Sequence, residues 1–209
     1  TYDPLEIVVG DVDLFGTLRR RARSEGLDVT ALLLTQDVDV PVVAVAVERD
    51  QWPKFALGSA AGLDPEAVAA GALAEALQNW MELRGMGRTE AADAAGALGH
   101  YAHRPDAAAS LTDAETRVPL SSVGPDDPPS GTAERTALVD RVTDAGLDPY
   151  ATRLTTRDLA AMGFEAVRVV CPAAQPLFFD DAYFGERAED VPEKLGFEAR
   201  PDRAHHPFP

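Results

Sequence analysis

The sequence has few lysines and almost no cysteine. Arginine supplies all of its cationic side chains except Lys54 and Lys194, and Cys171 is its single cysteine. One cysteine excludes an intrachain disulfide and a cysteine-based metal cluster, and its position at the end of an apolar run predicts a small buried hydrophobe. The sequence also lacks a signal peptide and an apolar run long enough to span a membrane. We therefore expect a cytoplasmic protein that does not act on membranes.

Acidic residues far outnumber basic ones. The formal net charge is −16 and the pI is about 4.5. This charge excludes a general nucleic-acid binder, which needs basic surface to neutralise phosphates, and it opposes docking on anionic membranes. Acidic, alanine-rich and lysine-poor composition is typical of proteins that work in molar salt, where the Debye length falls to about 3 Å and self-repulsion is screened. We favour a halophilic archaeal source, and the alternative is a genome of high GC content.

Several well-known catalytic and phosphate-binding motifs do not occur. The sequence contains neither a GxxxxGK[ST] phosphate loop nor a GxGxxG run after a strand, and it has no HExxH or GxSxG pattern. His100 and His103 are spaced to share a helix face, but no nearby cysteine or acidic motif supports zinc. We expect these two histidines to be a solvent-exposed pair.

An internal repeat is the strongest positive feature. Two segments about 120 residues apart match at a constant offset. The matching residues are Leu18, Arg21, Gly26, Leu27, Asp28, Ala31, Leu34 and Thr35 in the first segment and Leu138, Arg141, Gly146, Leu147, Asp148, Ala151, Leu154 and Thr155 in the second. Each segment then reaches an Asp and an apolar run. The spacing exceeds that of solenoid repeats, roughly 20–50 residues, so we interpret it as one helix–strand–strand unit used twice.

The repeat predicts an α+β (mixed α/β) fold in which helices cover the sheets and a helical insert separates the two copies. We expect one domain over residues 1–209, which is the C-terminal part of a longer chain. Its predicted parts are a first repeat unit (1–50), a helical insert (51–122), a second repeat unit (132–172) and a proline-rich tail (173–209). The Gly/Ala-rich run at 54–62 is expected to be a bend, and the Gly/Pro-rich run at 123–131 a loop.

A helix is predicted to begin at Asp64 and to end near Arg84. Asp64 as N-cap, proline at the first helical position and an acid in the first turn are typical of a helix start. Four residues spaced for one face of this helix are Gly71, Glu75, Gln78 and Glu82. Carboxylate and carboxamide oxygens on one stripe suit Mg²⁺, and the alternative is an ordinary solvated face. The backbone N–H groups of 58–62 are candidates for binding phosphate.

Three segments resemble the YcaO family. Residues 58–78 (GSAAGLDPEAVAAGALAEALQ) are similar to the family's second ATP-binding segment, in which an acid and a Glu or Gln one turn later hold the metal of the nucleotide. Residues 146–172 resemble a second family segment, with Asp158, Arg168 and Pro172 matching. The run from Phe184 to Gly196 and the Pro/His/aromatic tail match as well. The resemblance covers nearly the whole chain.

This resemblance implies ATP- and Mg²⁺-dependent chemistry on peptide backbone amides, leading to an azoline or a thioamide. ATP phosphorylates the amide oxygen after a nucleophile attacks the carbonyl. The residues that the resemblance assigns are Glu75 and Gln78 for the metal; Gly58, Ala61, Gly62, Asp64, Gln78 and Arg168 for the nucleotide; and His205, His206 and Pro209 near the amide. It also implies a peptide or protein substrate, a partner that delivers sulfur or recognises substrate, and a homodimer as one option.

The sequence departs from the family pattern in two ways. Asn79 and Trp80 stand where family members often carry Arg, and the family's first ATP-binding segment is not found in the 209 residues. These departures leave a second hypothesis open, namely a non-catalytic scaffold that presents peptide. A third hypothesis, a regulatory domain that binds a small molecule, rests on the repeat alone.

Overall fold

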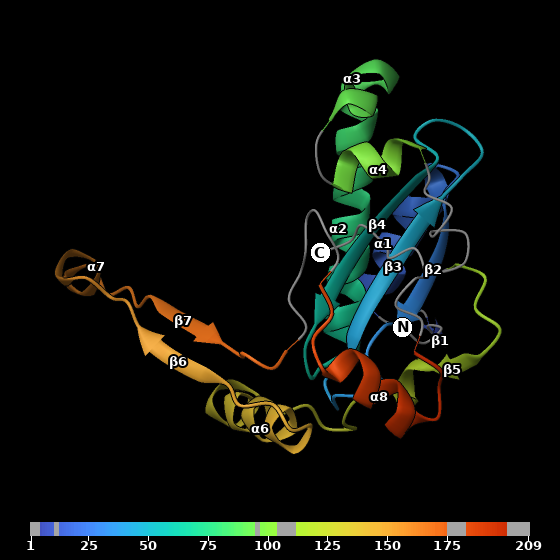
Figure 1. The fold of residues 1–209 in the computed structure, drawn as a ribbon. Coiled ribbons are helices and arrows are strands. Elements are labelled where there is room, and N and C mark those ends of the chain that lie inside the picture. Colours follow the sequence, from blue (N-terminus) through green and yellow to red (C-terminus); the bar gives the residue numbers. More distant parts are fainter. Residues whose placement is uncertain (1–4, 11–12, 95–96, 104–111, 175–182, 200–209) are drawn as a thin grey trace.

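A five-stranded mixed sheet lies at the centre of the molecule (Figure 1). The computed structural model describes residues 5–10, 13–94, 97–103, 112–174 and 183–199. The strands, in spatial order, are β4 (Phe55–Ala61), β3 (Val42–Glu48), β2 (Asp28–Leu33), β1 (Leu5–Val8) and β5 (Arg117–Pro119). Strand β1 pairs in parallel with β5, and all the other neighbours in this sheet are antiparallel.

Two helices cover one side of this sheet, and the remaining elements follow it in the chain. Helices α1 (Asp13–Ser24) and α2 (Pro65–Met86) pack against each other, and α2 also packs on β3 and β4 (Figure 1). The further elements are α3 (Arg88–Asp93), α4 (Ala97–His103), the 3₁₀ turn η1 (Leu120–Ser122), α6 (Gly131–Asp144), β6 (Tyr150–Arg153), α7 (Arg157–Ala161), β7 (Val167–Val170) and α8 (Arg187–Leu195). This architecture confirms the predicted α+β class.

The core forms between α2 and the two strands β3 and β4. Consecutive residues Val43 to Val47 are all at most 1 % exposed, so β3 is covered on both faces, as its uniformly apolar sequence predicts. Helix α2 contributes small side chains as well as Leu73 and Leu83, which are fully buried. Small residues let the helix axis approach the sheet closely, and this approach positions every side chain discussed below.

The predicted start of α2 is confirmed. Asp64 lies before the first turn, and one of its carboxylate oxygens accepts hydrogen bonds from the N–H groups of Glu66 (3.0 Å) and Ala67 (3.1 Å). Pro65 occupies the first helical position, where no N–H is needed. The helix ends at Met86, and Gly87 follows with a φ of 80°.

The bend expected at 54–62 is wrong, because Phe55–Ala61 form strand β4 at the edge of the sheet. Gly58 lies in the middle of this strand, and a Cβ placed on it would stand 2.3 Å from the N atom of Ala76 and 2.4 Å from the O atom of Ala72. The glycine is therefore needed for the close packing of α2 on β4, and it does not mark a turn. For the same reason the predicted insert at 51–122 is not purely helical.

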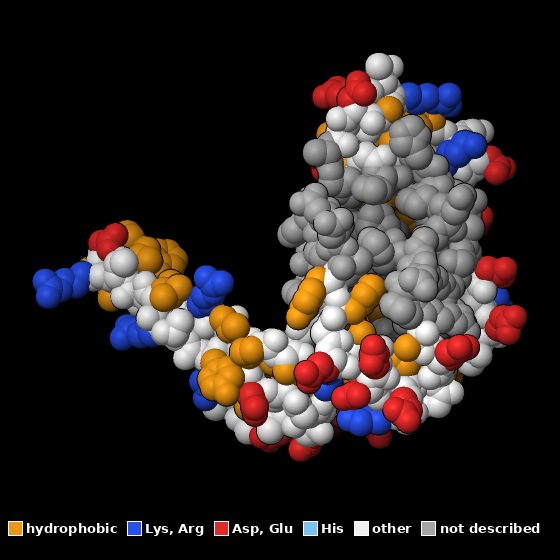
Figure 2. Space-filling view, viewed as in Figure 1, with side chains coloured by type: hydrophobic (Ala, Val, Ile, Leu, Met, Phe, Trp, Pro, Cys, Tyr) orange, Lys and Arg blue, Asp and Glu red, His pale blue; other side chains and the backbone are white. Residues whose placement is uncertain are grey.

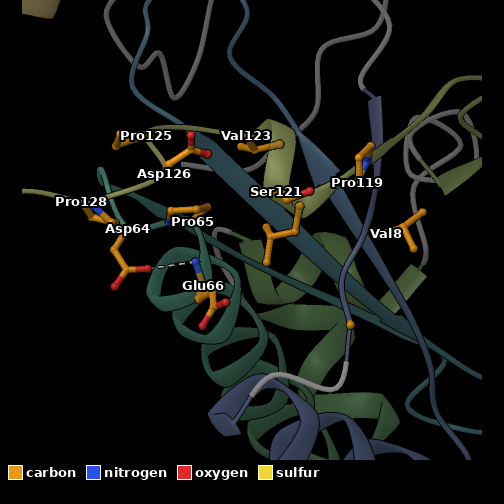
Figure 3. Close-up of a pocket in the computed structure, with 12 residues that line it drawn as sticks. Val8, Asp64, Pro65, Glu66, Pro119, Ser121, Val123, Pro125, Asp126 and Pro128 are labelled. Carbon is orange, nitrogen blue, oxygen red and sulfur yellow. Dashed lines mark hydrogen bonds between the residues drawn. The ribbon is translucent and has the colours of Figure 1, made fainter.

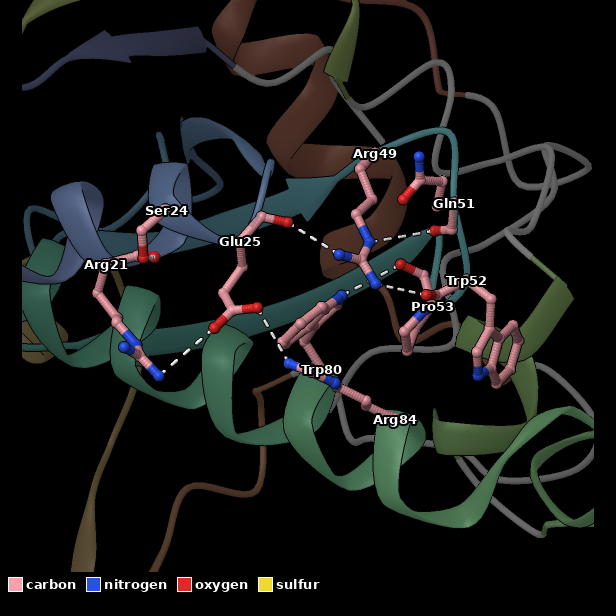
Figure 4. Close-up of polar contacts among 9 residues, drawn as sticks. All are labelled: Arg21, Ser24, Glu25, Arg49, Gln51, Trp52, Pro53, Trp80 and Arg84. Atoms are coloured by element: carbon pink, nitrogen blue, oxygen red, sulfur yellow. Dashed lines mark hydrogen bonds and ion pairs between the residues drawn. The ribbon is translucent and has the colours of Figure 1, made fainter.

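The far end of α2 is tied to the sheet through Trp80 (Figure 4). Trp80 is 1 % exposed and its indole N–H donates to the carbonyl oxygen of Pro53 (3.1 Å). The guanidinium groups of Arg49 and Arg84 lie over its ring at 4.7 and 5.3 Å from the centroid. Arg84 also pairs with Glu25 (3.0 Å), which follows α1. One aromatic side chain thus joins both helices to the β3–β4 turn.

The structure confirms the repeat. The first unit is α1–β2–β3 and the second is α6–β6–β7, and in both units the two strands form an antiparallel pair. Gly26 and Gly146 end the two helices with φ of 74° and 77°, and each is followed by a leucine whose N–H bonds five residues back at 3.1 Å. A glycine after the last helical residue is favoured because the left-handed conformation strains other residues.

The second unit projects from the molecule as an arm, which we define as residues 131–170 (Figure 2). Helix α6 has no buried residue, and every residue of β6 and β7 is exposed. The expectation that helices cover both sheets therefore fails for the two-stranded one within the described residues. Two contacts hold the base of the arm: Arg141 pairs with Asp39 (2.9 Å), and Arg187, which pairs with Asp37 (2.9 Å), donates a hydrogen bond to the carbonyl oxygen of Ala145 in the arm (2.8 Å).

We predict that Gly58→Ala destabilises the protein, because the added methyl group has no room against the backbone of α2. Overpacking of this kind costs about 1–3 kcal/mol. Urea unfolding followed by circular dichroism measures the change. Gly71→Ala is the matched control: its Cβ would meet only Ala60, at 3.5 Å, and it should stabilise the exposed face of α2 by up to about 1 kcal/mol. Equal effects of the two changes would contradict the close packing of α2 on β4.

Candidate functional site

The side chain of Glu75 is held against the edge of the sheet. Its Oε2 accepts a hydrogen bond of 2.6 Å from the backbone N–H of Ser59 in β4, and the residue is half-buried. One turn later, Asn79 donates from Nδ2 to the carbonyl oxygen of Leu57 (2.9 Å). Ser59 and Leu57 are two residues apart, so their polar groups point to the same edge of β4. Glu75 and Asn79, four residues apart on one helix face, therefore bind the unpaired edge of this strand.

These contacts explain the sequence at 79–80. Asn79 pairs with the backbone of β4 and Trp80 is buried, so both serve the packing of α2 and neither points to a phosphate. Gln78, by contrast, is exposed. The structure therefore brings Glu75 and Gln78 together on adjacent turns, with one anchored and the other free to reach a ligand.

Sequence reasoning missed Tyr101, which lies in α4 and is 2 % exposed. Its ring meets that of Phe55 edge-on, with centroids 5.9 Å apart. Burial, and secondarily the negative charge of Glu75, raises the pKa of Tyr101 above its ordinary value of 10.0. The sequence could not have predicted that Tyr101 lies near Glu75. The tyrosine stands alone in an alanine-rich segment, and only the packing of α4 on β4 brings it there.

The backbone N–H groups at 58–62 do not form the expected phosphate cradle. Gly58 and Ala60 lie in the ladder between β4 and β3, and the N–H of Ser59 binds Glu75. The N–H of Gly62 donates to the carbonyl oxygen of Pro41 (3.2 Å). The phosphate-binding arrangement does not form because this segment is a strand rather than a bend, and a strand directs successive N–H groups to opposite sides. Ala61 is exposed at the end of β4, next to Gly62.

A pocket of about 540 Å³ opens at the start of α2 (Figure 3). Its walls come from the end of β1, the first turn of α2, η1 and the loop at 123–128. Three acids, Asp64, Glu66 and Asp126, line it, so it favours cations over free phosphate. Nine residues of helix separate Glu66 from Glu75, about 14 Å at 1.5 Å per residue. The pocket is therefore distinct from the Glu75–Gln78 pair.

The remaining predicted site residues lie elsewhere. Arg168 is on β7 in the arm, opposite Thr152, and Figure 1 shows that the arm projects away from α2. Within one copy of the chain, the structure does not bring Arg168 together with Glu75. Asp158 accepts a hydrogen bond from Thr156 at the tip of the arm, and this bond lowers its pKa. His205, His206 and Pro209 lie outside the described residues.

The sequence matches the model of one protein family over most of its length. The family model "YcaO cyclodehydratase, ATP- and Mg²⁺-binding" matches residues 2–175, which is more than half of the chain. The chain belongs to the YcaO family. No curated protein matches it.

Three solved structures share this fold. A heterocyclase in complex with substrate and cofactor is 22% identical with a TM-score of 0.73, covering 93% of this chain and 26% of its own. The heterocyclase TruD is 20% identical with a TM-score of 0.73, covering 99% and 29%. YcaO from Methanopyrus kandleri bound with AMPPCP and Mg²⁺ is 25% identical with a TM-score of 0.62, covering 82% and 45%. The chain thus spans less than half the length of these structures.

The YcaO family is ATP- and Mg²⁺-binding, and Glu75 with Gln78 fits such a metal. Both offer hard oxygen ligands, and the bond from Ser59 orients the Glu75 carboxylate. No group of three or more His, Cys, Asp or Glu residues suited to a metal occurs in the part of the chain that the structure describes. Mg²⁺ usually takes one or two protein carboxylates and completes its shell with phosphate and water, so this donor set suits a metal that arrives with a nucleotide. None of the described helices is long and apolar enough to cross a bilayer.

We predict that Tyr101 stays protonated in the folded protein well above pH 10, because burial disfavours the phenolate. The difference between the ultraviolet titrations of wild type and Tyr101→Phe isolates its ionisation. Since the folded pKa exceeds the unfolded one, the free energy of unfolding should fall as pH rises above about 10, and Tyr101→Phe should remove part of that fall. A difference curve centred near pH 10 in the native protein would contradict this environment.

Proposed function

We propose that the chain is part of an enzyme that uses ATP and Mg²⁺ to activate backbone amides of a peptide, leading to an azoline or a thioamide. The observation that carries this proposal is the anchored carboxylate of Glu75 with Gln78 one turn later on α2. Membership of an ATP- and Mg²⁺-binding family supports it, as does the shared fold with the M. kandleri structure bound with AMPPCP and Mg²⁺.

In this proposal Glu75 and Gln78 bind the metal of the nucleotide from one face of α2. Mg²⁺ neutralises phosphate charge when it is bound, and the protein contributes mainly positioning. The backbone N–H of Ser59 orients the Glu75 carboxylate. We further propose that Ala61, exposed at the end of β4, lies at the approach to this face, that Arg168 binds phosphate, and that His205, His206 and Pro209 act near the amide.

The sulfur of a thioamide would have to come from outside the chain. Cys171 is the only cysteine of the 209 residues and lies half-buried just after β7, so a relay between two cysteines within these residues is excluded. A partner that delivers sulfur or recognises the substrate peptide is therefore part of the thioamide branch. The azoline branch needs no such donor, because a side chain of the substrate peptide is the nucleophile.

A second candidate is a scaffold that presents peptide without catalysing its modification. The position of Arg168, on an arm that projects away from Glu75, favours it. Peptide binding that does not depend on ATP would support the scaffold, whereas ATP-dependent binding would support the enzyme.

We predict that Glu75→Gln weakens Mg²⁺–ATP binding by about tenfold or more, since a contact to a charged group contributes about 1.5–3 kcal/mol. Glutamine keeps an oxygen that can accept from Ser59, so the unfolding midpoint should change little. Calorimetry in molar KCl measures the binding. Glu66→Gln, an exposed acid nine residues earlier on the same helix, is the matched control and should leave binding within about twofold. Unchanged binding in Glu75→Gln would refute the proposed role of Glu75.

A further inference from the structure

The arm has little contact with the rest of the molecule. Among residues 131–170 only Leu147 is buried, at 7 % exposed. Within the described residues, the one extensive packing contact of an arm element is that between β6 and β7, and Figure 2 shows the arm projecting from the body. A segment with so few buried apolar contacts is positioned by the contacts at its base. The orientation of the arm therefore depends on the residues around Leu147.

The contacts at this base meet at the carbonyl group that ends α6. Ala145 is the C-cap of α6, and its carbonyl oxygen accepts a hydrogen bond of 2.8 Å from Arg187. Another nitrogen of the same guanidinium pairs with Asp37 in the β2–β3 loop (2.9 Å), and these two side chains are 21 % and 23 % exposed. Carbonyl groups at a helix C-terminus lack helical partners and carry partial negative charge, so a guanidinium is a favourable partner. One arginine thus joins three segments that are far apart in the sequence.

The first copy of the repeat has an equivalent contact. Glu25 occupies the position that Ala145 has in the second copy, and its carbonyl oxygen accepts a hydrogen bond of 2.8 Å from Arg49. Arg49 also donates to the carbonyl oxygen of Trp52 and lies over the ring of Trp80 (Figure 4). An arginine therefore fastens the end of the repeat helix in both copies.

The two copies differ in what holds this arginine. Arg49 directly follows β3 and lies on Trp80, which is 1 % exposed, so the first fastening is part of the core. Arg187 is the first residue of α8, a helix in which only Pro192 is buried. In the part of the chain that the structure describes, α8 packs extensively on no other helix or strand. The fastening of the second copy can therefore be undone without disrupting the core.

The arm also lacks a second tie that the first copy has. In the first copy the side chain of Glu25 pairs with Arg84 on α2 (3.0 Å). Ala145, at the same position of the second copy, has no charged side chain to form such a pair. Arg141 pairs with an aspartate of the β2–β3 loop, but this aspartate is 78 % exposed, and exposed ion pairs contribute little. The contact of Arg187 is therefore the main restraint on the arm.

We propose that α8 is a latch for the arm. Arg187 fastens the junction of α6 and β6 to the β2–β3 loop and holds the arm in one orientation. When α8 is displaced, the arginine leaves with it and the arm turns about Leu147. A change at α8 is thus transmitted to the exposed strands β6 and β7. The latch goes beyond the proposed function and does not depend on it, so its test needs no ATP.

Distances between spin labels, measured by double electron–electron resonance, test the latch. The labels are placed on Ala160→Cys in α7 and Glu82→Cys in α2, both exposed positions, in a Cys171→Ser background. This chain should have one narrow distance distribution. Arg187→Met should broaden it about twofold or more, because few buried contacts then hold the arm. Arg49→Met is the matched control: it removes the equivalent bond of the first copy, should lower the thermal unfolding midpoint and should leave the distribution unchanged.

A second variant tests whether α8 itself is the latch. Pro192→Asp places a charge in the buried contact of α8 and should displace the helix, so it should broaden the distribution as Arg187→Met does. Circular dichroism verifies that each variant is folded, and if Arg187→Met does not fold, Pro192→Asp decides alone. An unchanged distribution in either folded variant overturns the proposal. Equal broadening in folded Arg49→Met, or a chain that is already as broadly distributed without these changes, overturns it as well.

Discussion

The close contact between helix α2 and strand β4 is the constraint on which the rest of the structure depends. Gly58 leaves room for the backbone of α2 at Ala72 and Ala76, and no larger residue would fit without displacing the helix. Once the helix lies that near, Glu75 and Asn79 reach the edge of β4 and bind the N–H of Ser59 and the carbonyl oxygen of Leu57. These two side-chain contacts occupy an N–H and a C=O group that the edge strand would otherwise offer to another strand. The same contact both completes the core and fixes the direction of the Glu75 carboxylate.

The two copies of the repeat have the same local structure but different surroundings. Both copies end their helix at a glycine with positive φ and both form an antiparallel strand pair. In the first copy the strands enter a sheet under α2. In the second they extend outward, held at the base by the ion pair of Arg141 with Asp39 and by the hydrogen bond from Arg187 to the carbonyl oxygen of Ala145. Partly exposed ion pairs of this kind contribute little to stability, so they orient the arm more than they stabilise it.

Much of the fold was predictable because local rules and tertiary structure agree. The cap at Asp64 and the helix that follows needed only short-range patterns, and the repeat predicted the arrangement of α6, β6 and β7 from that of α1, β2 and β3. The segment at 54–62 was predicted wrongly as a bend. Glycine and alanine have low strand propensity, and their presence in β4 reflects a helix that comes near in space rather than any local preference.

The sequence alone determined the family, the acidic character, the repeat and the helix that carries Glu75 and Gln78, because each of these resides in residue types at fixed spacing. Only the tertiary structure decided which of these groups meet. It assigned Gly58 to packing and Asn79 to the edge of β4, brought Tyr101 near Glu75, and placed Arg168 far from both on the arm. The physical reason is that spacing along a chain fixes neighbours within a helix or strand, whereas contacts between distant segments depend on how closely their surfaces pack.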